Sequence, residues 1–210
     1  MLLRFDQVSF TYASLAQPLF EGVSLHCGPG WTGIAGANGA GKSTLLKLAI
    51  GELEPQRGRV QRLATAVYAP QRTDDPPPDG VRFLEATDVS AGEWRGRLRI
   101  GVDWLSRWET LSHGERKRLQ IGAALWRNPE LLALDEPTNH IDAEARALLL
   151  AALRRFRGVG LLVSHDRALL DALCMQCVFI DPPDLAVRPG GVTAGLEQQG
   201  LERQQVRAAD

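Results

Sequence analysis

The stretch Gly36-Ala37-Asn38-Gly39-Ala40-Gly41-Lys42-Ser43 decides the fold, because it matches the phosphate-binding loop pattern, two glycines bracketing four residues before Lys-Ser. The apolar residues 31–35 before it predict a strand, and apolar positions at helical spacing through residues 45–49 predict a helix after it. A chance glycine turn with a surface lysine would lack these flanking elements. Glycines bring backbone N–H groups close to phosphate oxygens, and the helix adds its positive dipole end. The stretch therefore predicts a nucleoside triphosphate site, with Lys42 on the terminal phosphates and Ser43 on magnesium.

An acidic pair ends a second apolar run, residues 131–134, which predicts a parallel strand buried on both faces. Carboxylates at the end of a buried strand are costly unless they have a role. Asp135 is in the position to hold magnesium, and Glu136 can polarise a water for in-line attack. The apolar residues 160–163 predict a neighbouring strand that delivers His165 to the edge where open α/β sheets bind ligands. We therefore interpret His165 as a functional histidine.

Two further side chains are ambiguous by themselves. Gln71 follows Pro70 at the end of a strand predicted over residues 66–68, where a glutamine can reach a metal ion and orient a water. Tyr12 ends the strand-like run of residues 2–12, where an aromatic ring either packs at the strand end or stacks on a purine. Their places relative to the phosphate loop favour the functional interpretation of both.

The motif Leu111-Ser112-His113-Gly114-Glu115 marks the beginning of another helix, because Ser112 and Glu115 have the spacing of a capping box. Two interpretations stay open. The motif is either a well-capped helix and nothing more, or a helix whose first-turn amides face an anion. Asp142 has the place of the N-cap of a later helix.

The other segments predict a β-rich part and a helical part. Residues 2–12 and 19–25 predict an antiparallel ribbon, and residues 58–60 with 66–68 predict another strand pair. The proline-rich turn before residue 81 leads into a mostly helical insert, about 81–128. We interpret the three tryptophans of this insert, Trp94, Trp104 and Trp108, as packing residues rather than as a platform for base stacking.

Composition excludes several classes of protein. The 210 residues, 44% of them apolar and 23% charged, predict a soluble globular domain with a subdomain at most. Lys and Arg number 24 and Asp and Glu 25, so the overall charge demands neither nucleic acid nor an anionic membrane. No window is apolar enough to span a bilayer, and the N-terminus lacks the apolar region of a signal peptide. We interpret the three cysteines, Cys27, Cys174 and Cys177, as buried reduced thiols of a cytoplasmic protein.

In their order along the chain, these motifs resemble the nucleotide-binding domain of the ATP-binding-cassette (ABC) superfamily, from Phe5 to about Pro189. The resemblance rests on Tyr12, the loop 36–43, Gln71, the signature 111–115, the pair Asp135-Glu136, the Asp142 loop and His165. It implies an α/β fold with a P-loop core, an antiparallel β subdomain and a helical subdomain over about residues 72–128. We expect residues 1–190 to form this single domain, and the polar residues 191–210 to begin an interdomain linker.

The resemblance also implies that ATP and Mg²⁺ are bound and that ATP is hydrolysed. The catalytic residues would be Glu136, His165, Gln71 and Lys42, and the metal ligands Ser43, Gln71 and Asp135. The nucleotide would contact Tyr12, Gly36, Asn38, Gly39, Gly41, Lys42, Ser43 and Thr44 of one domain. Ser112, Gly114 and Glu115 of a second such domain would close over it from the other side. That second domain would belong to the same full-length chain or to a weak ATP-dependent homodimer.

Within the superfamily, the run 135–142 and the run Ser164-His165-Asp166-Arg167 look like the soluble ABC-F class, whose members act on the ribosome in translation. Transporter subunits more often have Ser-Ala at residues 139 and 140, but a motor subunit of a membrane transporter stays the alternative. A second alternative, a nucleotide-gated scaffold that seldom hydrolyses ATP, is supported only by His113, where the family usually has glycine. The basic run 116–118 fits an RNA-facing surface and a solvated helix face equally well.

Overall fold

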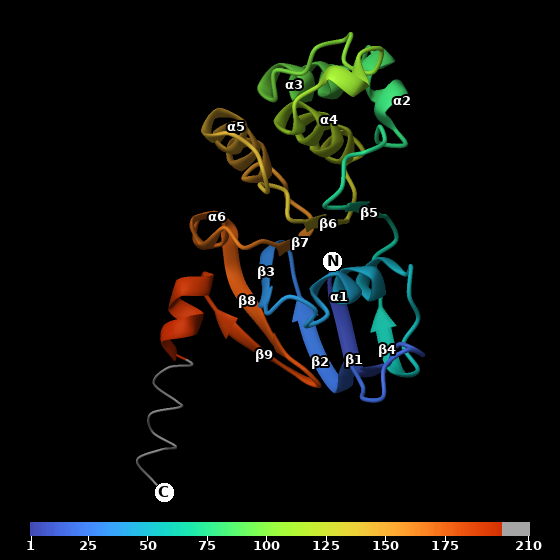
Figure 1. Cartoon of the computed structure of the whole chain (residues 1–210), viewed down its shortest axis with the longest axis vertical. Helices are drawn as coiled ribbons and strands as arrows, with labels where there is room; N and C mark the ends of the chain where they lie inside the picture. The colour runs from blue at the N-terminus through green and yellow to red at the C-terminus, as the bar shows by residue number, and fades with distance from the viewer. Residues whose placement is uncertain (199–210) are drawn as a thin grey trace, which may run out of the picture.

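The centre of the protein is a six-stranded sheet with the order β5-β6-β7-β3-β8-β9 (Figure 1). The structure, a computed structural model, describes residues 1–198. The strands are β3 (Gly30–Gly36), β5 (Ala66–Ala69), β6 (Leu131–Asp135), β7 (Val159–Val163), β8 (Cys174–Asp181) and β9 (Asp184–Pro189). The first five in spatial order run parallel, so β3, β6 and β7 end at one edge of the sheet. Every residue of β6 and β7 is buried, as the apolar runs predicted.

A smaller antiparallel sheet has the order β2-β1-β4, formed by β1 (Leu3–Phe10), β2 (Phe20–Cys27) and β4 (Arg57–Gln61). Helix α1 (Lys42–Ile50) packs with this sheet and the central one in a shared apolar core. The predicted ribbon of the first two strands is confirmed. The predicted pairing of residues 58–60 with 66–68 is wrong, because β4 pairs with β1 whereas β5 joins β6 in the other sheet. Alternation marks a strand but does not identify its partner.

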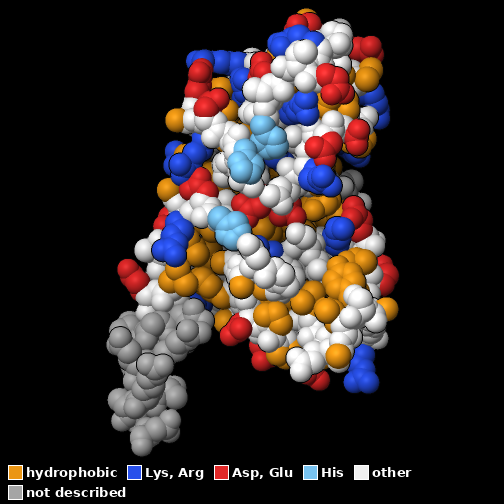
Figure 2. Space-filling view, viewed as in Figure 1, with side chains coloured by type: hydrophobic (Ala, Val, Ile, Leu, Met, Phe, Trp, Pro, Cys, Tyr) orange, Lys and Arg blue, Asp and Glu red, His pale blue; other side chains and the backbone are white. Residues whose placement is uncertain are grey.

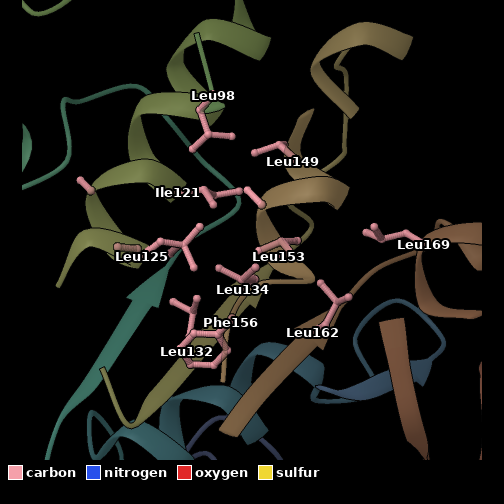
Figure 3. Packing of buried hydrophobic residues seen from close by; sticks show 14 of the residues in the cluster. Leu98, Ile121, Leu125, Leu132, Leu134, Leu149, Leu153, Phe156, Leu162 and Leu169 are labelled. Atoms are coloured by element: carbon pink, nitrogen blue, oxygen red, sulfur yellow. The ribbon is translucent and has the colours of Figure 1, made fainter. Parts of the chain in front are cut away.

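The helical subdomain lies beyond the β5–β6 end of the central sheet (Figure 1). It contains α2 (Gly80–Glu85), α3 (Val89–Arg97), the short 3-10 helix η1 (Trp108–Thr110) and α4 (His113–Trp126). Leu98 and Ile121 from this subdomain lie in one core with Leu134 of β6 and Leu149 of α5 (Ala143–Leu153) (Figure 3). Trp104 and Trp108 are buried in the same core, which confirms the packing interpretation for these two side chains. Within residues 1–198, no helix has the length and apolar character needed to cross a membrane.

The C-terminal part holds more regular structure than the sequence predicted. Helix α6 (Arg167–Leu173) leads into β8, and β9 pairs antiparallel with β8 at the sheet edge. The sequence analysis did not predict β9, because an edge strand needs no apolar alternation in its sequence. Val192 is buried, and a Cβ built on Gly195 would come within 2.5 Å of the Phe179 ring, so this part of the predicted tail packs on β8. The rest of the predicted linker, 199–210, lies outside the described residues.

All three cysteines are free and buried. Cys174 and Cys177 both belong to β8. Both sulfur atoms would lie close to a Cβ built on Gly33 of the adjacent strand β3, at 3.1 and 2.8 Å. The thiols thus fill the space beside a glycine in the sheet.

Candidate functional site

The phosphate-binding loop connects β3 to α1 and is held in shape by its own polar groups. Gly39 and Gly41 have φ angles of 80° and 102°, a left-handed backbone that L side chains rarely adopt. A Cβ on Gly41 would also lie 2.9 Å from the Leu19 side chain, whereas Gly39 faces open space. The Lys42 ammonium donates to the carbonyl oxygens of Gly36 and Ala37, at 2.9 Å each. Lys42 therefore folds back over its own loop, on the side where a phosphate chain would lie.

Residues from the first turn of α1 meet the ends of two parallel strands. The Ser43 hydroxyl donates to Oδ2 of Asp135 at 2.6 Å, and the Tyr68 hydroxyl donates to the same oxygen at 3.1 Å. Burial, with the charge of Asp135 beside it, raises the pKa of Tyr68 well above its usual range. Sequence reasoning missed Tyr68, because it had placed this strand in the wrong sheet; the parallel pairing of β5 with β6 puts Tyr68 next to the acidic strand.

Glu136 and His165 lie together at the ends of β6 and β7. Glu136 is 7% exposed and has a φ of 47°, a strained conformation for a glutamate. Its Oε2 accepts a hydrogen bond from the His165 backbone N–H at 3.1 Å, and Oε1 lies 3.3 Å from His165 Nε2. Oε1 has no hydrogen-bond partner of good geometry among the described residues. Burial raises the pKa of the Glu136 carboxyl, in spite of the opposing hydrogen bond from His165.

These groups line one open cleft of about 560 Å³. Of the predicted site residues, the cleft brings together Tyr12, Asn38, Gly39, Gly41, Lys42, Ser43, Thr44, Gln71, Asp135, Glu136 and His165. Asn139 also lines it, although we had not singled it out as a site residue. The Tyr12 hydroxyl is 3.0 Å from the Thr44 hydroxyl, and its ring stands edge-on to Phe10, so the tyrosine is held at the mouth of the cleft. Gly36 starts the loop but is absent from this lining.

A second hollow of about 610 Å³ lies behind the phosphate-binding loop. It shares Lys42 and His165 with the cleft, but its wall is formed largely by β8, β9 and residues that follow them, including Phe179 and Val192. Asp135 and Glu136 do not line this hollow. The phosphate loop and the acidic pair therefore meet in the smaller cleft and not in this hollow.

The remaining predicted site residues, Ser112, Gly114 and Glu115, are not in the cleft but at the N-terminus of α4. The capping box is confirmed: Ser112 Oγ accepts from the Glu115 N–H at 3.2 Å, and Glu115 Oε2 accepts from the Ser112 N–H at 2.8 Å. Gly114 allows α4 to approach α5, since a Cβ there would be 3.2 Å from that of Ala145.

His113, the departure from the family pattern, is half-buried at the start of α4. Its Nδ1 lies 3.4 Å from the Thr73 hydroxyl, and its ring centroid is 6.1 Å from that of His140. Figure 2 shows histidine side chains gathered in the middle of one face, with acidic side chains close by. Burial is the main effect that lowers the pKa of His113, and the charges of Lys117, His140 and Arg116 add to it.

The basic run next to this motif is not a surface patch. Lys117 is fully buried, while the Arg116 and Arg118 guanidinium groups lie over the rings of Trp108 and Trp104, at 5.4 and 5.0 Å from the ring centroids. Cations that stack on aromatic rings and donate to carbonyls inside their own domain are used for packing. Both earlier interpretations of residues 116–118, an RNA-facing surface and a solvated helix face, are therefore wrong.

The donor groups at the cleft suit a magnesium ion bound with a nucleotide. Ser43 and Asp135 offer a hydroxyl and a carboxylate oxygen 2.6 Å apart, and Mg²⁺ prefers oxygen ligands. No group of three or more His, Cys, Asp or Glu side chains that would hold a metal ion unaided occurs in residues 1–198. Mg²⁺ typically takes one or two protein carboxylates and fills its shell with water and phosphate oxygens.

Comparison with known proteins gives the same picture. Residues 20–139 match the family described as "ABC transporter". "ATP-binding protein Uup" of Caulobacter vibrioides is 37% identical over 174 residues, which cover 79% of this chain and 28% of that protein. "ABC transporter F family member 2" of Dictyostelium discoideum is 33% identical over 208 residues, 92% of this chain and 35% of that protein. A solved "Structure of ATP binding subunit of ABC transporter" superposes with a TM-score of 0.73 at 25% identity, and the match covers 100% of both chains.

The chain spans between 25% and 37% of the length of the curated relatives that it matches. Those relatives include ABC-F-type proteins. The family match alone covers more than half of the chain, and it runs from β2 through the phosphate loop and the acidic pair. The chain therefore belongs to the ABC transporter family, as one of its ATP-binding domains.

Proposed function

We propose that this chain is an ATPase module that binds ATP with Mg²⁺ in the 560 Å³ cleft and cleaves the terminal phosphate with Glu136 as general base. The observation that carries this proposal is the state of the Glu136 carboxylate. It is buried at the end of β6, oriented by the His165 N–H, and one of its oxygens is left without a hydrogen bond. Oε1 of this buried carboxylate lies 3.3 Å from His165 Nε2 but makes no hydrogen bond of good geometry, which is costly, so its retention supports a role in holding a water or substrate group.

The chain's own residues divide the remaining work. Lys42 can exchange its two carbonyl partners for phosphate oxygens, and the loop amides with the α1 N-terminus add further donors. Ser43 and Asp135 would hold Mg²⁺, with Gln71 at the cleft edge. When bound, that ion neutralises charge on the phosphates. His165, whose side chain is largely exposed, can contact both Glu136 and the terminal phosphate and so fix their positions relative to each other.

We further propose that a second domain of the same kind completes the site. Ser112 and the amides near Gly114 lie outside the cleft, so they are available to a nucleotide held by a partner domain. Each charge-assisted hydrogen bond across the closed pair contributes roughly 1.5–3 kcal/mol, so loss of the terminal phosphate would favour opening. The similarity to "ABC transporter F family member 2" supports an ABC-F-like protein. The proposal that it acts in the cytoplasm on the ribosome rests on the ABC-F-like runs 135–142 and 164–167 of the sequence.

The direct test is Glu136→Gln, which keeps the shape of the side chain and removes the base. We expect the variant to bind ATP, to accumulate as an ATP-bound dimer and to hydrolyse ATP about 10²–10⁴-fold more slowly. Phosphate release and size-exclusion chromatography measure these effects. Glu144→Gln, an exposed carboxylate on α5 outside the cleft, is the matched control. Full turnover by Glu136→Gln would remove the catalytic assignment.

A transporter motor subunit is the second candidate, and one observation favours it. A pocket of about 450 Å³ lies between the proline-rich loop and α4, lined by Pro70, Pro77, Gln120 and Arg127 among others. Such a pocket at the edge of the helical subdomain has room for a segment of a membrane partner. Co-purification separates the two candidates, with ribosomal particles expected for the first and a membrane permease for the second. Absence of phosphate release from a protein that binds ATP would favour the nucleotide-gated scaffold.

A further inference from the structure

A lysine is fully buried within α4, one turn after the capping box. The Lys117 ammonium donates to the carbonyl oxygen of Pro70 at 2.7 Å and to Oε1 of Gln120 at 2.9 Å. Both acceptors are neutral, and burial lowers the pKa of Lys117 to about 8. Burying an ammonium group is costly, whereas an unbranched apolar side chain would fill the same space without that cost. The placement of Lys117 therefore needs an explanation beyond packing.

Three side chains of α4 contact the segment that holds Gln71. Lys117 binds the carbonyl of residue 70, and the Gln120 amide donates to the carbonyl of residue 72 at 3.4 Å. Arg116 donates to the carbonyl of residue 73, also at 3.4 Å. Side chains of α4 thus hold the backbone on both sides of Gln71, while Gln71 itself is exposed and lines the nucleotide cleft.

We propose that Lys117 and Gln120 are positioning residues that fix Gln71 at the nucleotide cleft and tie it to the helix that presents Ser112. This inference rests on the proposed function. One helix then touches two nucleotides: its N-terminus meets the partner's ATP, and its second turn holds the segment that reaches its own.

The first experiment needs no nucleotide. Hydrogen exchange of the backbone amides of residues 71–73 is measured in the wild-type chain and in Lys117→Met, which keeps the length of the side chain and removes its donors. We expect exchange in this segment to be at least about tenfold faster in Lys117→Met, because local opening loses a charge-assisted hydrogen bond. Arg118→Met is the matched control. Arg118 belongs to the same helix as Lys117, but it donates to the carbonyls of Leu98 and Arg99 and not to the segment 70–73. Equal exchange in wild type and Lys117→Met would overturn the proposal.

The second experiment measures the affinity for ATP with magnesium chloride and with EDTA. We expect Lys117→Met to lose about tenfold of the magnesium-dependent gain in affinity, so that KM for ATP with magnesium rises by a similar factor, and we expect kcat to fall as well. Combined with Gln71→Ala, it should add nothing further, because both changes remove one function. If the fold-changes caused by Lys117→Met and Gln71→Ala multiply in the double variant, Lys117 does not act through Gln71. Gln120→Leu is the milder variant if Lys117→Met does not fold.

The two proposals fail in distinguishable ways. A wild-type chain that binds ATP without releasing phosphate would contradict the proposed hydrolysis, yet the exchange and affinity measurements would still decide the role of Lys117. A lower melting temperature in Lys117→Met, with unchanged exchange at residues 71–73 and an unchanged effect of magnesium, would show that the lysine only stabilises the fold. Either result leaves the other proposal standing.

Discussion

Two regions of this domain satisfy the hydrogen bonds of their polar groups differently. The first, the phosphate-loop side, comprises residues 36–43 with Asp135, and the second, the α4 side, comprises the N-terminus of α4 with Ser112 and Glu115. On the first side, Lys42 holds two carbonyls and Ser43 holds Asp135, so every one of these donors can be transferred to a nucleotide. On the second side, the Glu115 amide and the Ser112 amide are already paired within the capping box. The first side is prepared to bind ATP alone, whereas the second is stable without a ligand and has fewer groups to offer. From this difference we predict that a single domain binds ATP without closing on a partner.

The largest expected effect tests the first side of the comparison. Lys42→Met should weaken ATP binding by roughly 10- to 100-fold, because a charge-assisted contact with the terminal phosphates is lost. The gain in melting temperature on adding ATP and magnesium should disappear, since stabilisation by a ligand depends on its concentration relative to Kd. Lys47→Met, in the last turn of the same helix and outside the cleft, should keep the full gain. Undiminished ATP binding by Lys42→Met would place the nucleotide elsewhere.

A smaller effect should appear on the second side. Ser112→Ala removes the N-cap of α4 and should lower the free energy of unfolding by about 1 kcal/mol, or the melting temperature by about 2–4 °C. ATP affinity of the isolated chain should not change, because Ser112 does not line the cleft. Thermal unfolding and ATP titration of one preparation measure both quantities. If ATP affinity falls as far as in Lys42→Met, the two sides are not separate.

Sequence alone predicted the fold well where a local pattern determines the structure. The phosphate loop, the buried strands β6 and β7, and the caps at Ser112 and Asp142 all depend on residues close together in the chain. The site residues that follow these strands also meet in one cleft, because parallel strands end at one edge. Local sequence patterns do not determine which strands pair over long distances in the chain, so the predicted partner of β5 was wrong. Tyr68 and the buried Lys117 were missed for the same reason, since their partners depend on how α4 and β5 pack.

The smallest effect concerns acid sensitivity on the α4 side. Because burial lowers the pKa of His113 below its ordinary value of about 6.5, the unfolded chain binds a proton there more readily than the folded one. The contribution of His113 to stability is therefore full at pH 7 and is lost as the pH falls below that ordinary value. Asp74 is the one nearby acid that opposes this effect, against the positive charges of Lys117, Arg116 and His140.

His113→Gln should remove this loss. We expect the variant to lose less stability than the wild type between pH 7 and pH 5, by an amount on the order of 1 kcal/mol or less. Urea unfolding at the two pH values measures the difference, and His26→Gln, at an exposed position on β2, is the control. An equal loss in His113→Gln and wild type would show that the acid response of α4 lies elsewhere. A reduced loss would mean that the histidine in the signature stabilises the fold only while it stays neutral.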